Sequence, residues 1–285
     1  MTVRYLHVLF AAALVLLAPD ARHAFAFDKT GRAPHNWDSG ERLHKGDLTG
    51  LQRLRFLTTL DFPPFNHMDG GGKLSGLNIE IARAICKELE ISGLCQIQAL
   101  PWDELQPALK SGQGEAIIAG LAADANTRKS LAFTRPYMLP VARFAKRKDH
   151  ARIVETGGGL AAVSIAVVAG STHERMLRSY FPEATIASLP NTDALYRQLA
   201  DAKVDAIFAD GLTLSYWLAG KAGGACCEFW GESYFSTKLL GNGMRIAVKA
   251  EDVDLERSLN FALKSLHDKG VMDELYLKYF PVGFY

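Results

Sequence analysis

The chain has almost no surplus charge, since 32 lysines and arginines stand against 31 aspartates and glutamates in 285 residues. Binding to nucleic acid or to an acidic membrane through net charge needs a basic excess, so we expect neither partner. Apolar residues make up 48% of the chain and charged residues 22%, which is a globular balance with ample material for a core.

Motifs for metal sites and for several catalytic classes are also missing. The eight histidines and four cysteines form no His-x-x-x-His and no Cys-x-x-Cys pair. The sequence contains no phosphate-binding loop and no nucleophile elbow. We therefore expect neither a metal ion nor a cofactor.

Long apolar runs are confined to the N-terminus. Arg4 supplies a positive charge, residues 6–18 are almost wholly apolar, and Ala24-Phe25-Ala26 is a small-x-small cleavage motif. These are the three parts of a secretory signal, and the run is too short for an ordinary membrane span. We expect residues 1–26 to be removed and the product to be exported; an uncleaved N-terminal anchor is the alternative.

Export makes disulfides possible for the four cysteines. Cys86 and Cys95 flank the end of a predicted helix and the start of a predicted strand, and a bridge there would add about 2–3 kcal/mol of stability. Two buried free thiols are the alternative. Cys226 and Cys227 are adjacent, so they form either a vicinal disulfide, which we favour, or two reduced thiols.

Residues 27–50 are polar and without a clear period, which predicts an extended arm anchored by Trp37.

From residue 54 strands and helices alternate. Apolar residues at 77, 81, 85 and 89 predict a helix over 77–90 with one buried face. The predicted elements of two βαβαβ units are 54–60, 77–90, 95–99, 102–111 and 115–119, and then 164–169, 172–180, 185–189, 193–200 and 204–209. A last strand, 244–249, precedes two helices, 255–268 and 272–279.

Each βαβαβ unit predicts an α/β lobe with a mostly parallel sheet flanked by helices. Ligands of such sheets bind beyond the carboxyl ends of the strands. Four segments follow predicted strands and are the candidates for a site: 61–65, 120–128, 170–173 and Asp210.

Short motifs in a fixed order over residues 54–280 resemble the extracellular solute-binding proteins of family 3, the receptors of polar amino-acid ABC transporters. The runs that carry the resemblance are Phe62-Pro63-Pro64-Phe65, Gly76-Leu77-Asn78-Ile79-Glu80-Ile81, Trp102-Asp103-Glu104-Leu105-Gln106-Pro107-Ala108-Leu109, Ala116-Ile117-Ile118-Ala119-Gly120, Phe133-Thr134-Arg135-Pro136-Tyr137, Ala169-Gly170-Ser171-Thr172 and Val204-Asp205-Ala206-Ile207-Phe208-Ala209-Asp210.

The resemblance implies a two-lobed periplasmic-binding-protein fold of type II, in which the chain crosses twice between the lobes, near 141–143 and 243–246. The first lobe would comprise 51–142 and 247–285, and the second 143–246. Relatives that bind lysine, arginine, ornithine or histidine have a disulfide where Cys86 and Cys95 stand. The implied protein is a periplasmic monomer that binds an amino acid and delivers it to a membrane permease, without catalysis.

An amino acid carries a carboxylate and an ammonium, and both lose water when a cleft closes, so each needs a charged partner. Arginine suits the carboxylate because its planar fork donates two parallel hydrogen bonds. The family places this arginine where Thr127 stands, and Arg128 follows one residue later. We expect Arg128 to take the role; a solvated surface charge is the alternative.

The resemblance places Asp210 at the family's acidic position, where it would accept from the ammonium; a helix cap is the alternative. The turn at Gly170, Ser171 and Thr172 opens a helix whose amides and hydroxyls would face the carboxylate. His173 would contact the ligand side chain, or else lies on the surface.

Phe62 and Phe65 are expected to form an apolar platform for the ligand, with core packing as the alternative. Gly120 ends the third strand, and Ala122 and Asp124 replace the family's hydroxyl residues in the loop after it. Thr59 stands where binders of basic amino acids have an acid, although Asp61 lies two residues later, so we do not expect a strongly lysine-type pocket. The ligand-binding residues predicted from the sequence are Asp61, Phe62, Phe65, Gly120, Ala122, Arg128, Ser171, Thr172, His173 and Asp210.

Two other functions fit the same fold. A periplasmic cyclohexadienyl or arogenate dehydratase would need a buried carboxylic acid with a raised pKa, for which Asp61 or Asp124 is the candidate. A sensor subunit would present its closed form to a membrane kinase. The expected product of the sequence remains a receptor rather than an enzyme.

Overall fold

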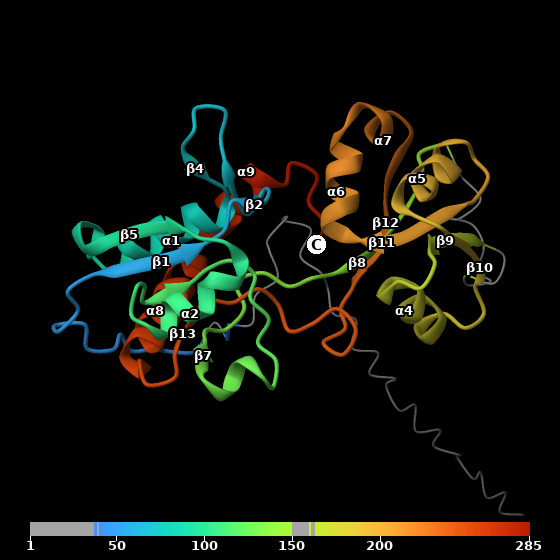
Figure 1. Cartoon of the computed structure of the whole chain (residues 1–285). Coiled ribbons are helices and arrows are strands. Elements are labelled where there is room, and N and C mark those ends of the chain that lie inside the picture. The colour runs from blue at the N-terminus through green and yellow to red at the C-terminus, as the bar shows by residue number, and fades with distance from the viewer. Residues whose placement is uncertain (1–36, 39, 150–159, 161–162) are drawn as a thin grey trace, which may run out of the picture. The chain divides into compact units, whose positions relative to one another are not determined.

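Two five-stranded sheets organise the computed structural model, which describes residues 37–38, 40–149, 160 and 163–285 (Figure 1). The predicted signal segment, 1–26, and much of the predicted arm lie outside the described residues. No helix in the described part is long and apolar enough to cross a membrane. Each sheet is covered by helices, so the chain forms two α/β lobes.

The first sheet has the order β5-β1-β6-β13-β7, with β1 parallel to β5 and β6, and β13 antiparallel to β6 and β7. Its strand β1 is buried on both faces: Leu54 and Phe56 join one core cluster, and Leu57 joins the other. The elements of this first lobe are β1 (Leu54–Thr58), α1 (Leu77–Glu88), β5 (Cys95–Ala99), α2 (Leu105–Lys110), β6 (Ala116–Ile117), β7 (Leu131–Phe133), β13 (Ala247–Lys249), α8 (Val253–Asp268) and α9 (Val271–Tyr279).

The second sheet has the order β10-β9-β11-β8-β12, in which β9, β10 and β11 are parallel, and β8 runs antiparallel to β11 and to β12. Phe208 and Ile207 of β11 point into opposite core clusters, so this sheet is also buried on both faces. The elements of this second lobe are β8 (Ala142–Arg147), β9 (Ser164–Val168), α4 (Thr172–Tyr180), β10 (Thr185–Leu189), α5 (Thr192–Ala200), β11 (Ala206–Asp210), α6 (Gly211–Ala219), α7 (Lys221–Cys226) and β12 (Cys227–Tyr234).

Most predicted elements are present, and β5, α4 and β10 match their predicted ranges residue for residue. The helix α1 buries the predicted face, because the apolar residues at 77, 81, 85 and 89 are all buried. The elements α6, α7, β7, β8 and β12 were not predicted. The loop predicted at 61–65 is partly wrong, since β2 (Asp61–Phe62) pairs with β3 (Asn66–Met68), which pairs with β4 (Leu74–Ser75) in a small antiparallel sheet.

Two connections join the lobes, one between β7 and β8 and one between β12 and β13. They touch each other at Met138 and Met244, where the Met244 amide donates to the Met138 carbonyl at 2.8 Å. Gly243 has φ of 87°, and a Cβ on it would lie 2.7 Å from the Met138 carbonyl oxygen. Glycine is therefore required for this close approach. The strand predicted at 244–249 shortens to β13 because its first residues belong to this connection.

The C-terminal residues, which the sequence assigns to the first lobe, also contact the second. Arg143 of β8 donates from Nη1 to the Phe284 carbonyl at 3.0 Å, and Ser215 of α6 donates to the Val282 carbonyl. The Tyr285 hydroxyl donates to the Leu139 carbonyl at 2.7 Å and accepts from the Leu139 amide at 3.0 Å. The end of the chain thus packs along the connection between β7 and β8.

Both cysteine pairs are disulfides. Cys86 in α1 is bonded to Cys95 at the start of β5, so the bridge holds a helix to the strand that follows it. Cys226 and Cys227 are bonded to each other where α7 meets β12. Trp37 is buried in the core of the first lobe, and the Arg135 guanidinium lies 4.9 Å from its ring centre, as expected for an anchor of the arm.

Thr59, which differs from the acid that binders of basic amino acids have, belongs to a chain of buried polar side chains. Thr59 accepts from Asn66 at 2.7 Å, Asn78 donates to Asn66 at 2.8 Å, and Tyr137 donates to Asn78 at 2.7 Å. Burial raises the pKa of Tyr137, which therefore stays a neutral donor. Thr59 and Asn78 are thus paired through Asn66 inside the first lobe.

Candidate functional site

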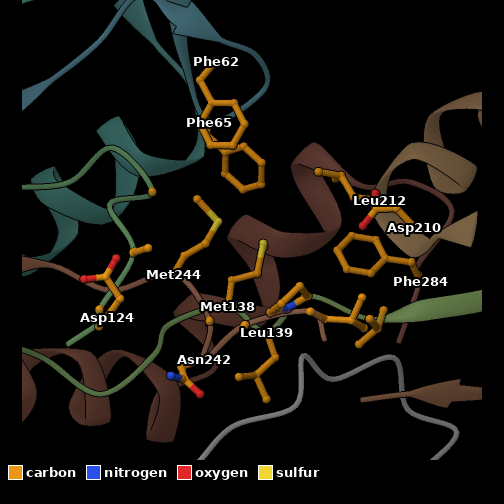
Figure 2. A pocket seen from close by; sticks show the side chains of 18 residues that line it. Phe62, Phe65, Asp124, Met138, Leu139, Asp210, Leu212, Asn242, Met244 and Phe284 are labelled. Carbon is orange, nitrogen blue, oxygen red and sulfur yellow. The ribbon is translucent and has the colours of Figure 1, made fainter. Parts of the chain in front are cut away.

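A cavity of about 390 Å³ is lined by both lobes and by both connections (Figure 2). Its walls come from loops beyond the carboxyl ends of β1, β6 and β11, as expected for open α/β sheets. The lining residues are Phe62, Phe65, Gly120, Ala122, Ala123, Asp124, Met138, Leu139, Pro140, Val141, Asp210, Leu212, Leu240, Gly241, Asn242, Gly243, Met244 and Phe284.

The first lobe contributes an aromatic surface. Phe62 and Phe65 stack with ring centres 4.8 Å apart and planes 29° apart, as Figure 2 shows at the top of the cavity. Phe65 is buried, whereas Phe62 is 37% exposed and forms the accessible face of the pair. Gly120 has φ of 81°, and a Cβ there would lie 3.1 Å from the Phe62 ring. A larger residue at 120 would thus strain the backbone and crowd this ring.

Asp124 is the charged residue that the first lobe places on the wall. Its Oδ1 accepts from the Asn126 amide at 2.8 Å and from the Thr127 amide at 2.9 Å, which closes a tight turn. These hydrogen bonds lower the pKa of Asp124, with the Thr127 amide contributing most. Asp124 is therefore a carboxylate at neutral pH.

Asp210 is the charged residue contributed by the second lobe. It ends β11 and caps α6, since its Oδ1 accepts from the Thr213 amide at 2.8 Å and from the Thr213 hydroxyl at 2.7 Å. The helix cap that was the alternative to a ligand role is thus present, and Asp210 lines the cavity as well. Both bonds use Oδ1, which orients the carboxylate and leaves Oδ2 for a ligand.

The turn at 170–173 does not line this cavity. Ser171 caps α4, because its hydroxyl accepts from the Glu174 amide at 3.0 Å. The Glu174 carboxylate accepts in turn from the Gly170 amide at 2.7 Å and from the Ser188 hydroxyl at 2.5 Å. Together with Arg178, these bonds lower the pKa of Glu174 to about 2. A carboxylate of the chain itself therefore occupies the start of α4.

Thr172 and His173 also have partners inside the second lobe. The Thr172 hydroxyl accepts from Arg175 at 3.0 Å. The His173 ring lies edge-on to Phe208, with centres 6.3 Å apart, so this half-buried histidine packs against the core of the second lobe. Burial lowers the pKa of His173 against the opposing charge of Asp210, and the ring is neutral at neutral pH.

Arg128 faces a different cavity, of about 610 Å³, beside residues 42–47 of the arm and the start of α8. Its guanidinium lies 5.4 Å from the Phe133 ring centre, and Nε donates to the Ala123 carbonyl at 3.3 Å. The pKa of Arg245 in the same wall is lowered by burial and then by the charge of Arg128. The structure therefore does not bring Arg128 together with Asp210.

Five predicted site residues line the cavity, and five do not. Asp61 is exposed in β2 and joins the second group. The residues that line the cavity are Phe62, Phe65, Gly120, Ala122 and Asp210; those that do not are Asp61, Arg128, Ser171, Thr172 and His173. Their roles toward a ligand stay predictions in both groups.

The residues that sequence reasoning missed lie mostly on the two connections. Met138 and Met244 point toward the Phe62 and Phe65 pair in Figure 2. The predicted crossings between the lobes could have pointed to these residues, because a cavity between two lobes must border the segments that join them. Phe284 carried no such signal, since its place depends on the fold of the C-terminal residues. Among the described residues no group of histidine, cysteine, aspartate and glutamate side chains could hold a metal ion.

Two α/β lobes, two connections and a cavity lined from both lobes define a two-lobed solute-binding protein. Residues 54–282 match the family model of the bacterial extracellular solute-binding proteins, family 3, and the chain belongs to that family. The fold is the type II periplasmic-binding-protein fold predicted from the sequence.

Named relatives and a solved structure agree with this assignment. The chain is 28% identical to the histidine-binding periplasmic protein of Escherichia coli K12, over 82% of this chain and 90% of that protein. It is 28% identical to the arginine-binding periplasmic protein of Mannheimia haemolytica, over 76% and 87%. The L-cystine solute receptor of Neisseria gonorrhoeae has the same fold, with a TM-score of 0.66 at 16% identity over 81% of this chain and 94% of that one.

Proposed function

We propose that the chain is the periplasmic substrate-binding component of an ABC importer, and that the cavity at Phe62 and Asp210 binds an amino acid for delivery to a membrane permease. The observation that carries the proposal is the joint lining of this cavity, with an aromatic pair from one lobe and an oriented carboxylate from the other. Relatives named for binding histidine and arginine support the ligand class.

The cavity has the two features that such a ligand needs. Asp210 offers an ionised oxygen to an ammonium or guanidinium group, and Phe62 offers a ring face to the ligand's carbon chain. Micromolar binding requires about 8 kcal/mol net. A desolvated charge pair with Asp210 and the apolar surface of the cavity would each contribute to it.

The lobe boundaries remain part of the proposal. We place 51–142 and 247–285 in the first lobe and 143–246 in the second, and the paired connections at Met138 and Met244 support this division. Closure would then be a rotation of two rigid bodies about these connections. We also propose export with cleavage after Ala26, a periplasmic location and a monomeric state.

A pure receptor is favoured over a dehydratase. The enzyme needs a protonated carboxylic acid at neutral pH, but hydrogen bonds lower the pKa of Asp124. Asp61 lies in β2 and outside the cavity. Incubation with prephenate and with arogenate is expected to give no phenylpyruvate and no phenylalanine; formation of either product would contradict the receptor assignment.

A thermal-shift screen of the exported chain against the common amino acids tests the proposal. A ligand at 100 times its Kd stabilises the folded state by about 2.7 kcal/mol, which is a shift of several degrees. At least one amino acid is expected to give such a shift, and isothermal titration then measures its Kd. If no amino acid raises the thermal midpoint, the proposal is wrong.

A further inference from the structure

The cavity carries negative charge and, among the described residues, no positive charge. Asp124 and Asp210 are its charged lining side chains, and Asn242 adds a neutral polar group. The rest of the described lining is apolar, aromatic or glycine and proline. This wall suits a cation, but it offers no side chain to pair with a carboxylate.

The two groups expected to hold a ligand carboxylate are used elsewhere. Arg128 lies in the wall of the other cavity, over Phe133. The start of α4 does not line the cavity, and the Glu174 carboxylate there accepts from the Gly170 amide. A ligand carboxylate at that place would also meet the like charge of Glu174.

Among the described residues, the titratable groups whose pKa responds to the charge of Asp210 are His173, Tyr196 and Tyr285. Burial lowers the pKa of His173 and raises the pKa of both tyrosines, so all three are neutral at neutral pH. Arg143 of β8 donates to the carbonyls of Phe284 and Gly231 and stacks at 4.5 Å on Phe229. Its guanidinium therefore serves the fold of the C-terminal residues and does not line the cavity.

Loss of water makes this cavity unfavourable for a ligand carboxylate. A carboxylate moved into an apolar cavity without a partner costs several kcal/mol, and two nearby anions add to this cost. Burial of an ammonium or guanidinium group in the cavity costs less, because Asp210 would pair with the group and the face of the Phe62 ring would attract it.

We propose that this cavity selects its ligand by a cationic nitrogen attached to an apolar body, and that a carboxylate on the ligand is dispensable. The ligand class is organic cations, which includes the basic amino acids and equally the amines that lack their carboxylate. The inference rests on the proposed function, because it concerns the same cavity. It differs from the expectation, drawn from Thr59, that the pocket is not strongly lysine-type, since Asp124 and Asp210 supply acidic groups.

Matched ligand pairs test the inference directly. Arginine is compared with agmatine, and lysine with cadaverine; each second compound is the first without its carboxylate. Isothermal titration is expected to give Kd values for the amines that are equal to those of the amino acids within about threefold, or tighter. An amino acid that binds at least tenfold more tightly than its amine would overturn the inference.

Other outcomes separate this inference from the proposed function. Binding of glutamine or glutamate without binding of any of the four cations overturns the inference and leaves the amino-acid receptor intact. No binding of any amino acid or amine overturns both.

The variant Arg128→Gln gives a second, independent readout. It is expected to change the Kd of arginine and of agmatine by the same factor, and by less than about twofold. Selective weakening of arginine would show that Arg128 pairs with the ligand carboxylate and would overturn the inference. The folded state of the variant is checked by its thermal midpoint.

Discussion

The two lobes contribute to one cavity in different ways. The first lobe supplies area, through the stacked rings of Phe62 and Phe65, whereas the second supplies an ionised oxygen of Asp210 held by a helix cap. Apolar area gives affinity without much discrimination, while a desolvated charge decides which ligands are accepted. We therefore expect the first lobe to contribute mainly to affinity and the second lobe mainly to the choice of ligand.

The strongest test of how the lobes differ concerns their disulfides. Replacing Cys86 and Cys95 by serine removes a cross-link between residues nine apart, which is expected to lower the free energy of unfolding by about 2–3 kcal/mol. Replacing Cys226 and Cys227 removes a bond between neighbours, which closes no chain loop, so the loss is expected to be smaller. Urea unfolding of both double variants measures the difference; equal losses would contradict it.

The next largest effect is expected from Asp210→Asn. Asparagine caps a helix as well as aspartate does, so stability should hold. A hydrogen bond to a charged group is worth about 1.5–3 kcal/mol, so affinity for a cationic ligand should fall about 10- to 100-fold. The matched control is Asn191→Asp at the cap of α5, outside the cavity, and it should leave affinity unchanged. If Asp210→Asn keeps its affinity for a cationic ligand, the choice of ligand is made by the first lobe.

A smaller loss is expected from Phe62→Ala. An aromatic contact with a cation or ring is worth about 0.5–1.5 kcal/mol, which corresponds to a loss of about 2- to 13-fold in affinity. Trp102→Ala is the control, because Trp102 is 51% exposed and lies outside the cavity. If both variants bind equally well, the first lobe does not contribute its aromatic surface to binding.

The smallest effect is on acid stability in the second lobe. The pKa of Glu174 is lowered from 4.5 to about 2 in the folded state, so its stabilisation is present above pH 4.5 and is lost as the pH falls toward 2. Glu174→Gln should therefore have a flatter dependence of the thermal midpoint on pH over this interval. Parent and variant melting curves between pH 6 and 2.5 measure it; parallel curves would show that Glu174 is not held in this way.

The folds of both lobes were largely predictable because their signals are local. The range of α4 follows from Ser171 as N-cap, and the ranges of β5 and β10 follow from short stretches of mixed apolar and polar residues between turn residues. The elements α6, α7 and β12 were missed because residues 211–234 mix apolar residues with five glycines and show no clear period, so helix and strand could not be separated there. The small sheet of β2, β3 and β4 was missed because its strands are only two or three residues long.

The candidate site was predictable only in part. Phe62, Gly120 and Asp210 follow strands directly, so the topology alone brings them to the cavity. Arg128 lies further along its loop, beyond the turn that Asp124 closes, and that turn sends it to the other cavity. Glu174 did carry a signal, since Ser171-Thr172-His173-Glu174 is a capping-box sequence, which predicts that the chain's own carboxylate is used at this helix start.

By itself the sequence determined the family, the two α/β lobes and the segments that can reach a ligand, because these depend on periodicity, turn residues and short motifs along the chain. Only the tertiary structure decided which charges share the cavity. Asp124 and Asp210 both line it, while Arg128 and the start of α4 lie outside it. The physical reason is that the direction of a loop side chain and the partner of a helix terminus are set by packing and hydrogen bonds between segments far apart in the sequence.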